Sequence, residues 1–233
     1  MTQVCYRTGR LTQRTITTTT FGELLMEELL KTSQELAELF PDGAIFIGGI
    51  AVYLHSKSQG LLHLAESSHD GDFYISLIDF ADLRDLEEIT PNRRLNKYQL
   101  IKNGWEFDVY VERNNHLAIP FCEVNAEKIV IDNLPCACLE HLLILKLDAY
   151  SDRFHSSKGD KDKRDIIRIL NMMKSPRIDI LKNYLDQEKI KLIKLAISDN
   201  SKYLEMCKNN SQQASALRKS TQKNSQILLD LEV

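Results

Sequence analysis

The sequence predicts an α+β fold in which a small mixed sheet flanked by helices is followed by a C-terminal helical region. Short apolar runs alternate with helical patterns over the first part of the chain. Asn103 and Gly104 separate two strand-like runs, which is the pattern of an antiparallel hairpin. Later apolar residues recur at helical spacing. We therefore predict an α/β domain over residues 1–135, beginning with an extended arm at 1–19, and a helical domain over residues 136–233.

Composition places the chain among ordinary globular proteins. Its 233 residues, 43% apolar and 27% charged, can bury a substantial core. No apolar run approaches the roughly 18–20 residues needed to cross a bilayer, and residues 1–10 lack the apolar core of a secretory signal. The five cysteines are scattered, and the spacing of Cys136 and Cys138 is too tight for a usual zinc site. We expect a cytoplasmic protein with buried thiols and no membrane contact.

The two parts of the chain carry opposite charge. Residues 1–150 contain 13 basic and 22 acidic residues, whereas residues 151–233 contain 17 basic and 11 acidic ones. The net charges are therefore −9 in front and +6 behind. An acidic site beside a basic helical region would suit metal ions on one side and a polyanion on the other. A solvated helical surface would explain the same charges.

Local patterns predict the elements of the first part. Leucines at helical spacing predict a helix that ends at Phe40, before turn residues. Apolar or alternating runs predict strands at Ala44–Ile47, Gly71–Leu77, Tyr98–Lys102, Trp105–Val111 and Lys128–Ile131, with His116–Cys122 as a possible sixth. Short helices are predicted at Ile50–Ser56, after two glycines, and at Ala81–Glu88, before Pro91.

The second part reads as helices. Leu139–Tyr150 is strongly apolar, and amphipathic helices are predicted at about Asp160–Met173, Asp179–Leu185 and Glu188–Ile197. The charged run Lys158–Arg168 could contact nucleic acid phosphates, or it could be a solvated helix start with its own ion pairs.

A glycine turn and a pair of acids suggest chemistry. Gly48 and Gly49 lie between an apolar strand and a helix, so backbone N–H groups could approach phosphates there. Asp70 and Asp72 lie two residues apart at the start of the next strand, so their side chains share one face. Two carboxylates that close repel each other unless a cation lies between them. A solvated loop with two acids is the alternative interpretation.

Asp108 strengthens the interpretation as a site. It lies on a strand of the predicted hairpin, between Phe107 and Val109, which face the opposite side as core residues. An acid between apolar neighbours on a strand is either at an edge or in a site. The hairpin could place Asp108 beside the first two carboxylates.

This arrangement resembles the polymerase-beta-like nucleotidyltransferase superfamily, which has a Gly-Gly or Gly-Ser turn, an Asp-x-Asp pair and a third Asp on a later strand. The resemblance implies a nucleotidyltransferase fold and divalent ions, most plausibly Mg²⁺, held by Asp70, Asp72 and Asp108. It implies that Gly48 and Gly49 approach the phosphates of a nucleoside triphosphate. It also implies that Asp108 helps to remove the proton of the attacking hydroxyl.

A second block is similar to the AbiEii/AbiGii toxin group of nucleotidyltransferases. The similarity rests on Lys146 within an apolar helix, on Arg153 after that helix, and on the later run from Lys161 to Ile166. The resemblance implies that Lys146 contacts nucleotide phosphate, that Arg153 helps to bind the nucleotide, and that Asp162 or Asp165 supports activity. A side chain that snorkels at the helix edge is the alternative for Lys146.

The resemblance covers roughly residues 44–172, with two departures. Ile50 follows the glycines where a Ser or Thr hydroxyl would contact phosphate. Gly71 lies between the two acids where an apolar residue is usual, and glycine is a poor strand former. Neither departure removes a metal ligand.

The sequence is therefore compatible with three functions. The first is a toxin of a bacterial toxin–antitoxin or abortive-infection system that transfers a nucleotidyl group to RNA, probably tRNA, or to protein, with a cognate antitoxin as partner. The second is a nucleotidyltransferase acting on a small molecule of the antibiotic type. The third is a catalytically silent nucleotide-binding or interaction protein, which the departures at Ile50 and Gly71 motivate.

Overall fold

The computed structural model describes residues 21–40 and 43–231, so the predicted arm at 1–19 lies outside the described part. The strands are β1 (Ala44–Ile47), β2 (Asp70–Ile75), β3 (Ile89–Asn92), β4 (Lys97–Lys102), β5 (Trp105–Val111), β6 (Ile129–Ile131) and β7 (Leu134–Cys136). The helices are α1 (Phe21–Leu39), α2 (Gly48–Ser58), the 3₁₀ turn η1 (Leu62–Leu64), α3 (Leu77–Leu86), α4 (Phe121–Ala126), α5 (Leu139–Asp152), α6 (Ser157–Met172), α7 (Ile178–Leu181), α8 (Gln187–Ser198), α9 (Asn200–Met206) and α10 (Ser211–Leu229). The predicted α+β fold is confirmed.

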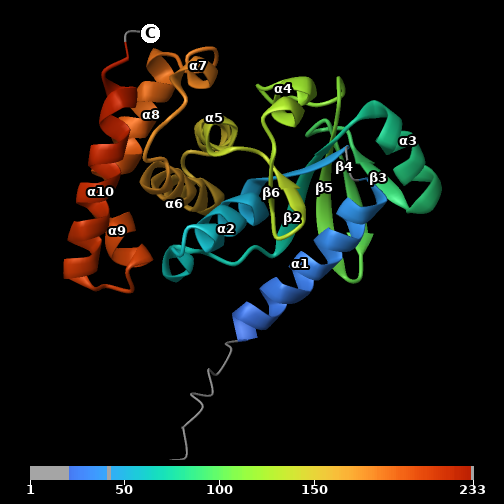
Figure 1. Cartoon of the computed structure of the whole chain (residues 1–233), viewed down its shortest axis with the longest axis horizontal. Helices are drawn as coiled ribbons and strands as arrows, with labels where there is room; N and C mark the ends of the chain where they lie inside the picture. Colours follow the sequence, from blue (N-terminus) through green and yellow to red (C-terminus); the bar gives the residue numbers. More distant parts are fainter. Residues whose placement is uncertain (1–20, 41–42, 232–233) are drawn as a thin grey trace, which may run out of the picture.

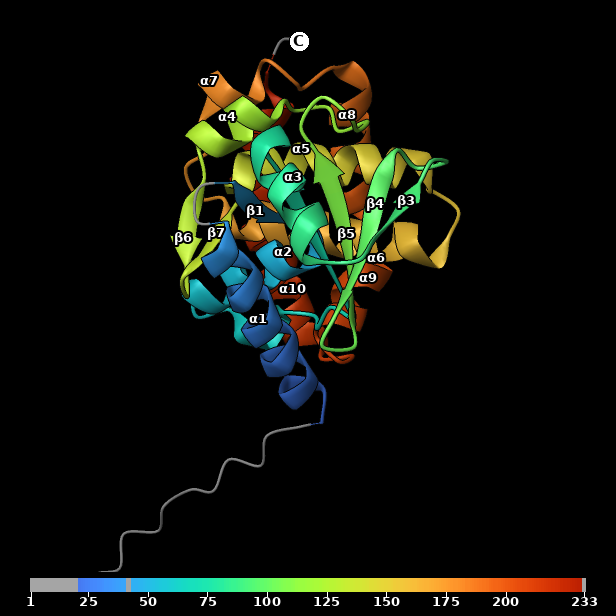
Figure 2. The same ribbon diagram turned by 90° about the vertical axis from the view of Figure 1, so that its right-hand side faces the viewer.

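The described strands form one mixed sheet in the order β3-β4-β5-β2-β1-β7-β6. Strand β2 runs parallel to β5 and β1 runs parallel to β7, whereas the other neighbours are antiparallel. Figure 2 shows β3 and β6 towards opposite sides of the sheet. All four residues of β1 are buried, as expected for a short apolar strand near the middle of a covered sheet.

The predicted hairpin is confirmed. Lys102 in β4 pairs with Trp105 in β5 across a two-residue turn. Asn103 and Gly104 in that turn have φ of 52° and 81°. Positive φ at both positions is what a tight hairpin turn needs, which explains the Asn-Gly pair.

The helices form layers on the sheet. Helix α2 packs against β1 and β2 on one side and against α5 and α6 on the other. Figure 1 shows α8, α9 and α10 on the outside, with α5 and α6 between them and the sheet. One hydrophobic cluster extends from Met26 in α1 to Leu228 in α10. Within the described residues, no helix has the length and low charge needed to cross a membrane.

Two helices begin earlier than predicted because serines cap them. The Ser76 side chain accepts a hydrogen bond from the Asp79 backbone N–H, so α3 begins at Leu77 rather than near residue 81. The Ser156 side chain likewise accepts from the Gly159 N–H, and α6 begins at Ser157.

Other differences lie in short or polar segments. The possible strand at His116–Cys122 does not form, and α4 begins at Phe121 instead, directly after Pro120. Strands β3 and β7 were not predicted, since each is short and contains a proline. The Asn/Gln/Ser-rich tail contributes α10, a helix of 19 residues.

Candidate active site

The turn from β1 to α2 presents backbone groups to the proposed site. Gly48 has φ of +67°, and a Cβ at this position would lie 2.2 Å from Oδ2 of Asp72. Only glycine fits such a left-handed position with so close an approach. The N-cap residue Ile47 is apolar and makes no side-chain hydrogen bond to the first backbone N–H groups of α2. These groups and the carboxylate therefore meet at one end of the sheet.

The three predicted acids lie on adjacent strands. Asp70 and Asp72 are on β2, and Asp72 is paired with Asp108 of the parallel strand β5. Because paired residues of neighbouring strands project to the same face, the three carboxylates share that face. The sequence-based expectation that the hairpin brings Asp108 beside the other two is thus confirmed by the register.

Each carboxylate has different neighbours. Ser68 Oγ donates a hydrogen bond of 3.1 Å to Asp70 Oδ1. Asp108 Oδ2 forms an ion pair with Lys97 Nζ, and Asp108 Oδ1 is buried without a hydrogen-bond partner among the described residues. Lys97 reaches Asp108 from β4, one diagonal step across the hairpin. An unpartnered buried carboxylate oxygen is costly unless something binds it.

The electrostatics of the cluster favour a cation. Burial, followed by the charges of Asp70 and Asp108, raises the pKa of Asp72 to about 6. Burial and the charges of Asp72 and Asp108 also raise the pKa of the Tyr110 hydroxyl. Burial is the largest cause of both shifts, and the neighbouring carboxylates add negative charge that a bound cation would relieve.

The donors suit a hard metal ion, although they are not gathered into a metal cage. Three carboxylates offer the oxygen ligands that Mg²⁺ prefers. In this conformation, however, no group of three acidic, histidine or cysteine side chains within the described chain is arranged to hold a metal ion. Asp108 is instead paired with Lys97. Lys97 occupies only Oδ2 of Asp108, so Oδ1 is the oxygen of this carboxylate that a metal ion would use.

The two departures from the superfamily pattern have structural explanations. A Cβ on Gly71 would lie 2.3 Å from Cδ1 of Phe107, its partner on β5. The Phe107 ring thus occupies the space that a larger side chain at residue 71 would fill. Ile50 is fully buried in the core, and its Cδ1 lies 3.2 Å from the same Cβ position. Neither residue displaces Asp70 or Asp72 from β2.

Lys146 is buried and does not snorkel. Its Nζ lies 2.7 Å from Asp165 Oδ2 and 3.3 Å from Asp162 Oδ1. Burial alone would lower the pKa of Lys146, but Asp165 and Asp162 outweigh it and raise that pKa. Arg153 binds Asp162 through two hydrogen bonds, from Nε at 2.5 Å and from Nη2 at 2.9 Å. The structure therefore brings the four predicted residues of this block together, with the cations facing acids.

Sequence reasoning missed Lys161 as a site residue. A Cβ on Gly49 would lie 3.5 Å from Lys161 Nζ and 2.6 Å from Ser68 Oγ. Lys161 is half-buried, and within residues 21–40 and 43–231 it forms no ion pair. Its position in the charged run Lys158–Arg168 was the available signal. The contact with Gly49 depends on how α6 packs on α2, which the sequence does not reveal.

Comparison with solved structures identifies the fold. A candidate nucleotidyltransferase from H. pylori superposes with a TM-score of 0.50 and 17% identity, over 92% of this chain and 100% of that chain. JHP933 from Helicobacter pylori superposes with a TM-score of 0.47 and 16% identity, over 90% of this chain and 97% of that chain. An antigenic nucleotidyltransferase-like protein from Paracoccidioides brasiliensis superposes with a TM-score of 0.45 and 16% identity, over 79% of this chain and 92% of that chain. No family model matches the sequence, and a search of curated proteins finds no significant match. The chain has a nucleotidyltransferase fold.

Proposed function

We propose that this protein is a Mg²⁺-dependent nucleotidyltransferase that uses a nucleoside triphosphate. One observation carries the proposal. Asp70 and Asp72 on β2 face Asp108 on the paired strand β5, beside the glycine turn that begins α2. A nucleotidyltransferase fold with carboxylates and a helix N-terminus at this place supports transfer chemistry on phosphates.

Asp70, Asp72 and Asp108 are the residues that would hold Mg²⁺. When bound, the ion would neutralise triphosphate charge and lower the pKa of an attacking hydroxyl. Within the part of the chain that the structure describes, Oδ1 of Asp108 has no hydrogen-bond partner, and this oxygen would accept the hydrogen bond of that hydroxyl. In the transfer, a bond forms from the acceptor oxygen to the α-phosphorus while the bond from that phosphorus to the bridging oxygen breaks. Pyrophosphate leaves, and the hydroxyl proton passes to the base.

The phosphates have a natural place at the β1–α2 turn. Gly48 and Gly49 allow close approach of the backbone, and the N-terminus of α2 favours negative charge. Lys161 adds a cation beside Gly49 that makes no ion pair within the described part of the chain. Lys146 and Arg153 face acids in this conformation, so these contacts favour Lys161 for direct phosphate contact. Lys146 would then act through Asp162 and Asp165.

The acceptor of the nucleotidyl group is proposed to be RNA or protein. The likeness of the Lys146 and Lys161–Ile166 blocks to the AbiEii/AbiGii toxins supports transfer to RNA, with tRNA first, or to protein. The basic excess after residue 150 also supports a polyanionic acceptor. A cognate antitoxin is the partner that this role implies.

Label transfer tests the acceptor. The protein would be incubated with Mg²⁺, each of the four nucleoside triphosphates labelled at the α-phosphate, and either total tRNA, a protein extract or a set of small alcohols and amines. We expect label in tRNA, and none with Asp72→Asn. Transfer to small molecules alone would contradict the toxin role.

A second candidate is a nucleotide-binding protein without catalysis. The ion pair between Lys97 and Asp108 favours it, because a lysine already neutralises the predicted base. Calorimetry with Mg²⁺ and nucleoside triphosphate, on wild type, Asp70→Ala and Asp72→Ala, separates binding from chemistry. Wild-type binding without any label transfer would favour this candidate. If both variants bind the nucleoside triphosphate as tightly as wild type does, neither candidate function can include the proposed metal site.

A further inference from the structure

The segment between α2 and β2 carries Ser68 of the candidate site and leads directly into Asp70. Residues 61–69 contain the short turn η1 and then run to Asp70 without regular structure. Ser68 in this segment donates to Asp70, and its Oγ lies beside Gly49. The position of the segment therefore determines where the first carboxylate lies relative to the glycine turn.

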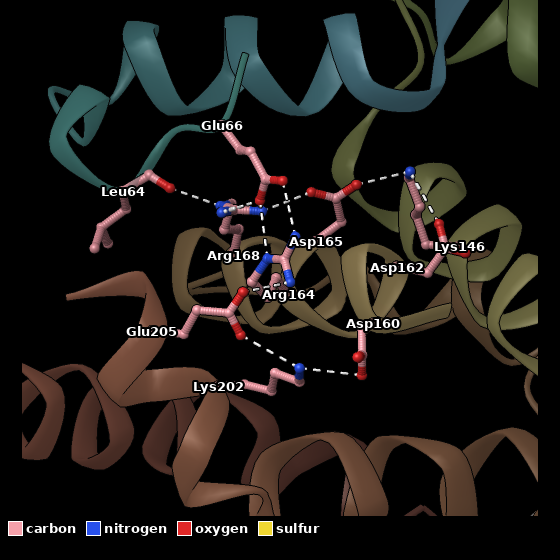
Figure 3. Close-up of polar contacts among 10 residues, drawn as sticks. All are labelled: Leu64, Glu66, Lys146, Asp160, Asp162, Arg164, Asp165, Arg168, Lys202 and Glu205. Atoms are coloured by element: carbon pink, nitrogen blue, oxygen red, sulfur yellow. Dashed lines mark hydrogen bonds and ion pairs between the residues drawn. The ribbon is translucent and has the colours of Figure 1, made fainter. Parts of the chain in front are cut away.

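Two arginines of α6 hold this segment through Glu66. Arg164 donates to Glu66 twice, from Nε to Oε2 at 2.9 Å and from Nη2 to Oε1 at 2.8 Å. Arg168 Nη2 donates to Glu66 Oε2 at 2.8 Å, and its Nε donates to the Leu64 carbonyl at 2.6 Å. Figure 3 shows both guanidinium groups directed at the one carboxylate. We call Glu66, Arg164 and Arg168 the arginine clamp.

The arginine clamp is joined to the rest of the candidate site. Arg168 Nη1 donates to Asp165 Oδ1 at 2.8 Å, and Asp165 pairs with Lys146. The side chains of Arg168 and Asp165 are only 5% and 3% exposed, so this link is shielded from water and salt. One face of α6 thus holds Lys146 from α5 and the segment that precedes Asp70 (Figure 3).

A further link leads outward to α9. Arg164 Nη1 donates to Glu205 Oε1 at 2.8 Å, and Lys202 pairs with Glu205 and with Asp160. Glu205 is half exposed, so this pair contributes little to rigidity. It provides a matched control, because Glu205 and Glu66 bind the same arginine from opposite sides of the site.

We propose that Glu66 is a positioning residue, and that the arginine clamp sets the metal affinity of the Asp70–Asp72 pair by fixing residues 64–68 against α6. The inference rests on the proposed metal site. Groups that orient metal ligands typically change metal affinity by about 10–100-fold when removed. The Glu66 carboxylate acts through Ser68 and Asp70 and does not itself touch the metal or the substrate.

Binding of Mn²⁺ alone, followed by the electron paramagnetic resonance signal of the free ion, tests the proposal without any turnover. We expect Glu66→Gln to weaken Mn²⁺ binding about 10-fold. Glu205→Gln should leave it within about 2-fold, since the clamp keeps both arginine contacts to Glu66. Asp70→Asn, the positive control, should remove most of the binding. Titrations are run at a temperature at which circular dichroism shows every variant folded.

Arg164→Lys is the second variant, in case Glu66→Gln does not fold. It keeps the positive charge but loses the two-pronged contact, and Glu205→Gln controls for its other partner. We expect Arg164→Lys to weaken Mn²⁺ binding more than Glu205→Gln does. Equal affinity in wild type and the folded clamp variants would overturn the inference while leaving the metal site in place. A wild type that binds no Mn²⁺ would overturn both the inference and the proposed metal site.

Discussion

Two lysines of the candidate site differ in what their ammonium groups face. Lys146 is buried between Asp162 and Asp165, whereas Lys161 lies beside Gly49 and forms no ion pair with any residue that the structure describes. A buried charge with two acids stabilises the fold only while the pair is intact. A half-buried free cation next to a glycine turn is available to a ligand.

Exchanging each lysine for an uncharged residue should therefore separate stability from binding. Lys146→Met removes the cation that both buried acids share and leaves Asp162 with Arg153 and Asp165 with Arg168, so we expect a loss of about 1–3 kcal/mol in the free energy of unfolding. Lys161→Met should change that free energy by less than about 1 kcal/mol and weaken triphosphate binding about 10-fold. Urea denaturation and calorimetry with Mg²⁺ and nucleoside triphosphate measure the two quantities. The opposite pattern would assign phosphate contact to Lys146.

Glu66 should make stability depend on acid pH. Burial alone would raise its pKa, but Arg164 and Arg168 lower it to about 2 from 4.5. A carboxylate whose pKa is lower in the folded state stabilises the fold above the unfolded pKa, and this stabilisation is lost as pH falls from about 4.5 towards 2. Because its side chain is 32% exposed, we expect about 2 kcal/mol at pH 7.

The measurement is the difference in unfolding free energy between wild type and Glu66→Gln, from urea titrations at several pH values. The difference should be largest at neutral pH and shrink as pH falls below about 4.5. Glu205→Gln should show a much smaller difference throughout. A gap that stays constant with pH would mean that the Glu66 charge contributes nothing to stability.

Only some residues of the candidate site can be predicted from the amino-acid sequence. Asp70, Asp72 and Asp108 follow from strand alternation and a hairpin, which are local patterns. Three further residues reach the site only through the tertiary structure. The loop before β2 brings Ser68 to Asp70, a diagonal contact between strands brings Lys97 to Asp108, and the packing of α6 on α2 brings Lys161 to Gly49. Those contacts depend on tertiary structure, so local patterns do not reveal them.

The β1–α2 turn offers a test of close packing within one element. Gly48 and Gly60 have nearly the same φ, +67° and +70°, but a Cβ on Gly60 would meet nothing within 4 Å. Gly60→Ala should therefore cost only the left-handed backbone penalty, about 1 kcal/mol. Gly48→Ala adds a clash with Asp72, and we expect it to cost about 1–3 kcal/mol more and to lose Mn²⁺ binding. Equal losses of stability would mean that the turn does not press on Asp72.

The β2–β5 pair contains a second close contact, between Gly71 and Phe107. Gly71→Ala should cost about 1–3 kcal/mol in unfolding free energy, because its Cβ would overlap the Phe107 ring. In a Phe107→Leu background the same substitution should cost less, since the ring is gone. Urea denaturation of the four proteins gives the coupling energy. Additive losses would contradict the view that Phe107 compensates for Gly71.

Element prediction succeeded where local signals were strong. The hairpin, β1 and α5 follow from Asn103-Gly104, from a four-residue apolar run and from a long apolar helix. Strands β3 and β7 are four and three residues long and contain prolines, so their assignment depends on pairing partners elsewhere in the sheet. The start of α6 was missed because the charged run Lys158–Arg168 follows directly after the cap at Ser156.

The molecule as a whole assembles its candidate site across α6. This helix lies between the outer helices and α2, and its side chains reach Lys146, Glu66 and the glycine turn (Figures 1 and 3). The sheet supplies the three carboxylates, and α6 supplies the cations and anchors around them. Such an arrangement suits a triphosphate held between an acidic strand pair and a basic helix.

The most direct test of the central claim follows the two ends of the triphosphate. Nucleoside triphosphate labelled at either the α- or the γ-phosphate would be incubated with Mg²⁺, total RNA and wild type or Asp108→Asn. We predict that the α label becomes attached to RNA while the γ label is released as pyrophosphate, and that Asp108→Asn does neither. Absence of α-label transfer would contradict RNA as the acceptor, and transfer of the γ label instead, or full activity of Asp108→Asn, would contradict nucleotidyl transfer at this site.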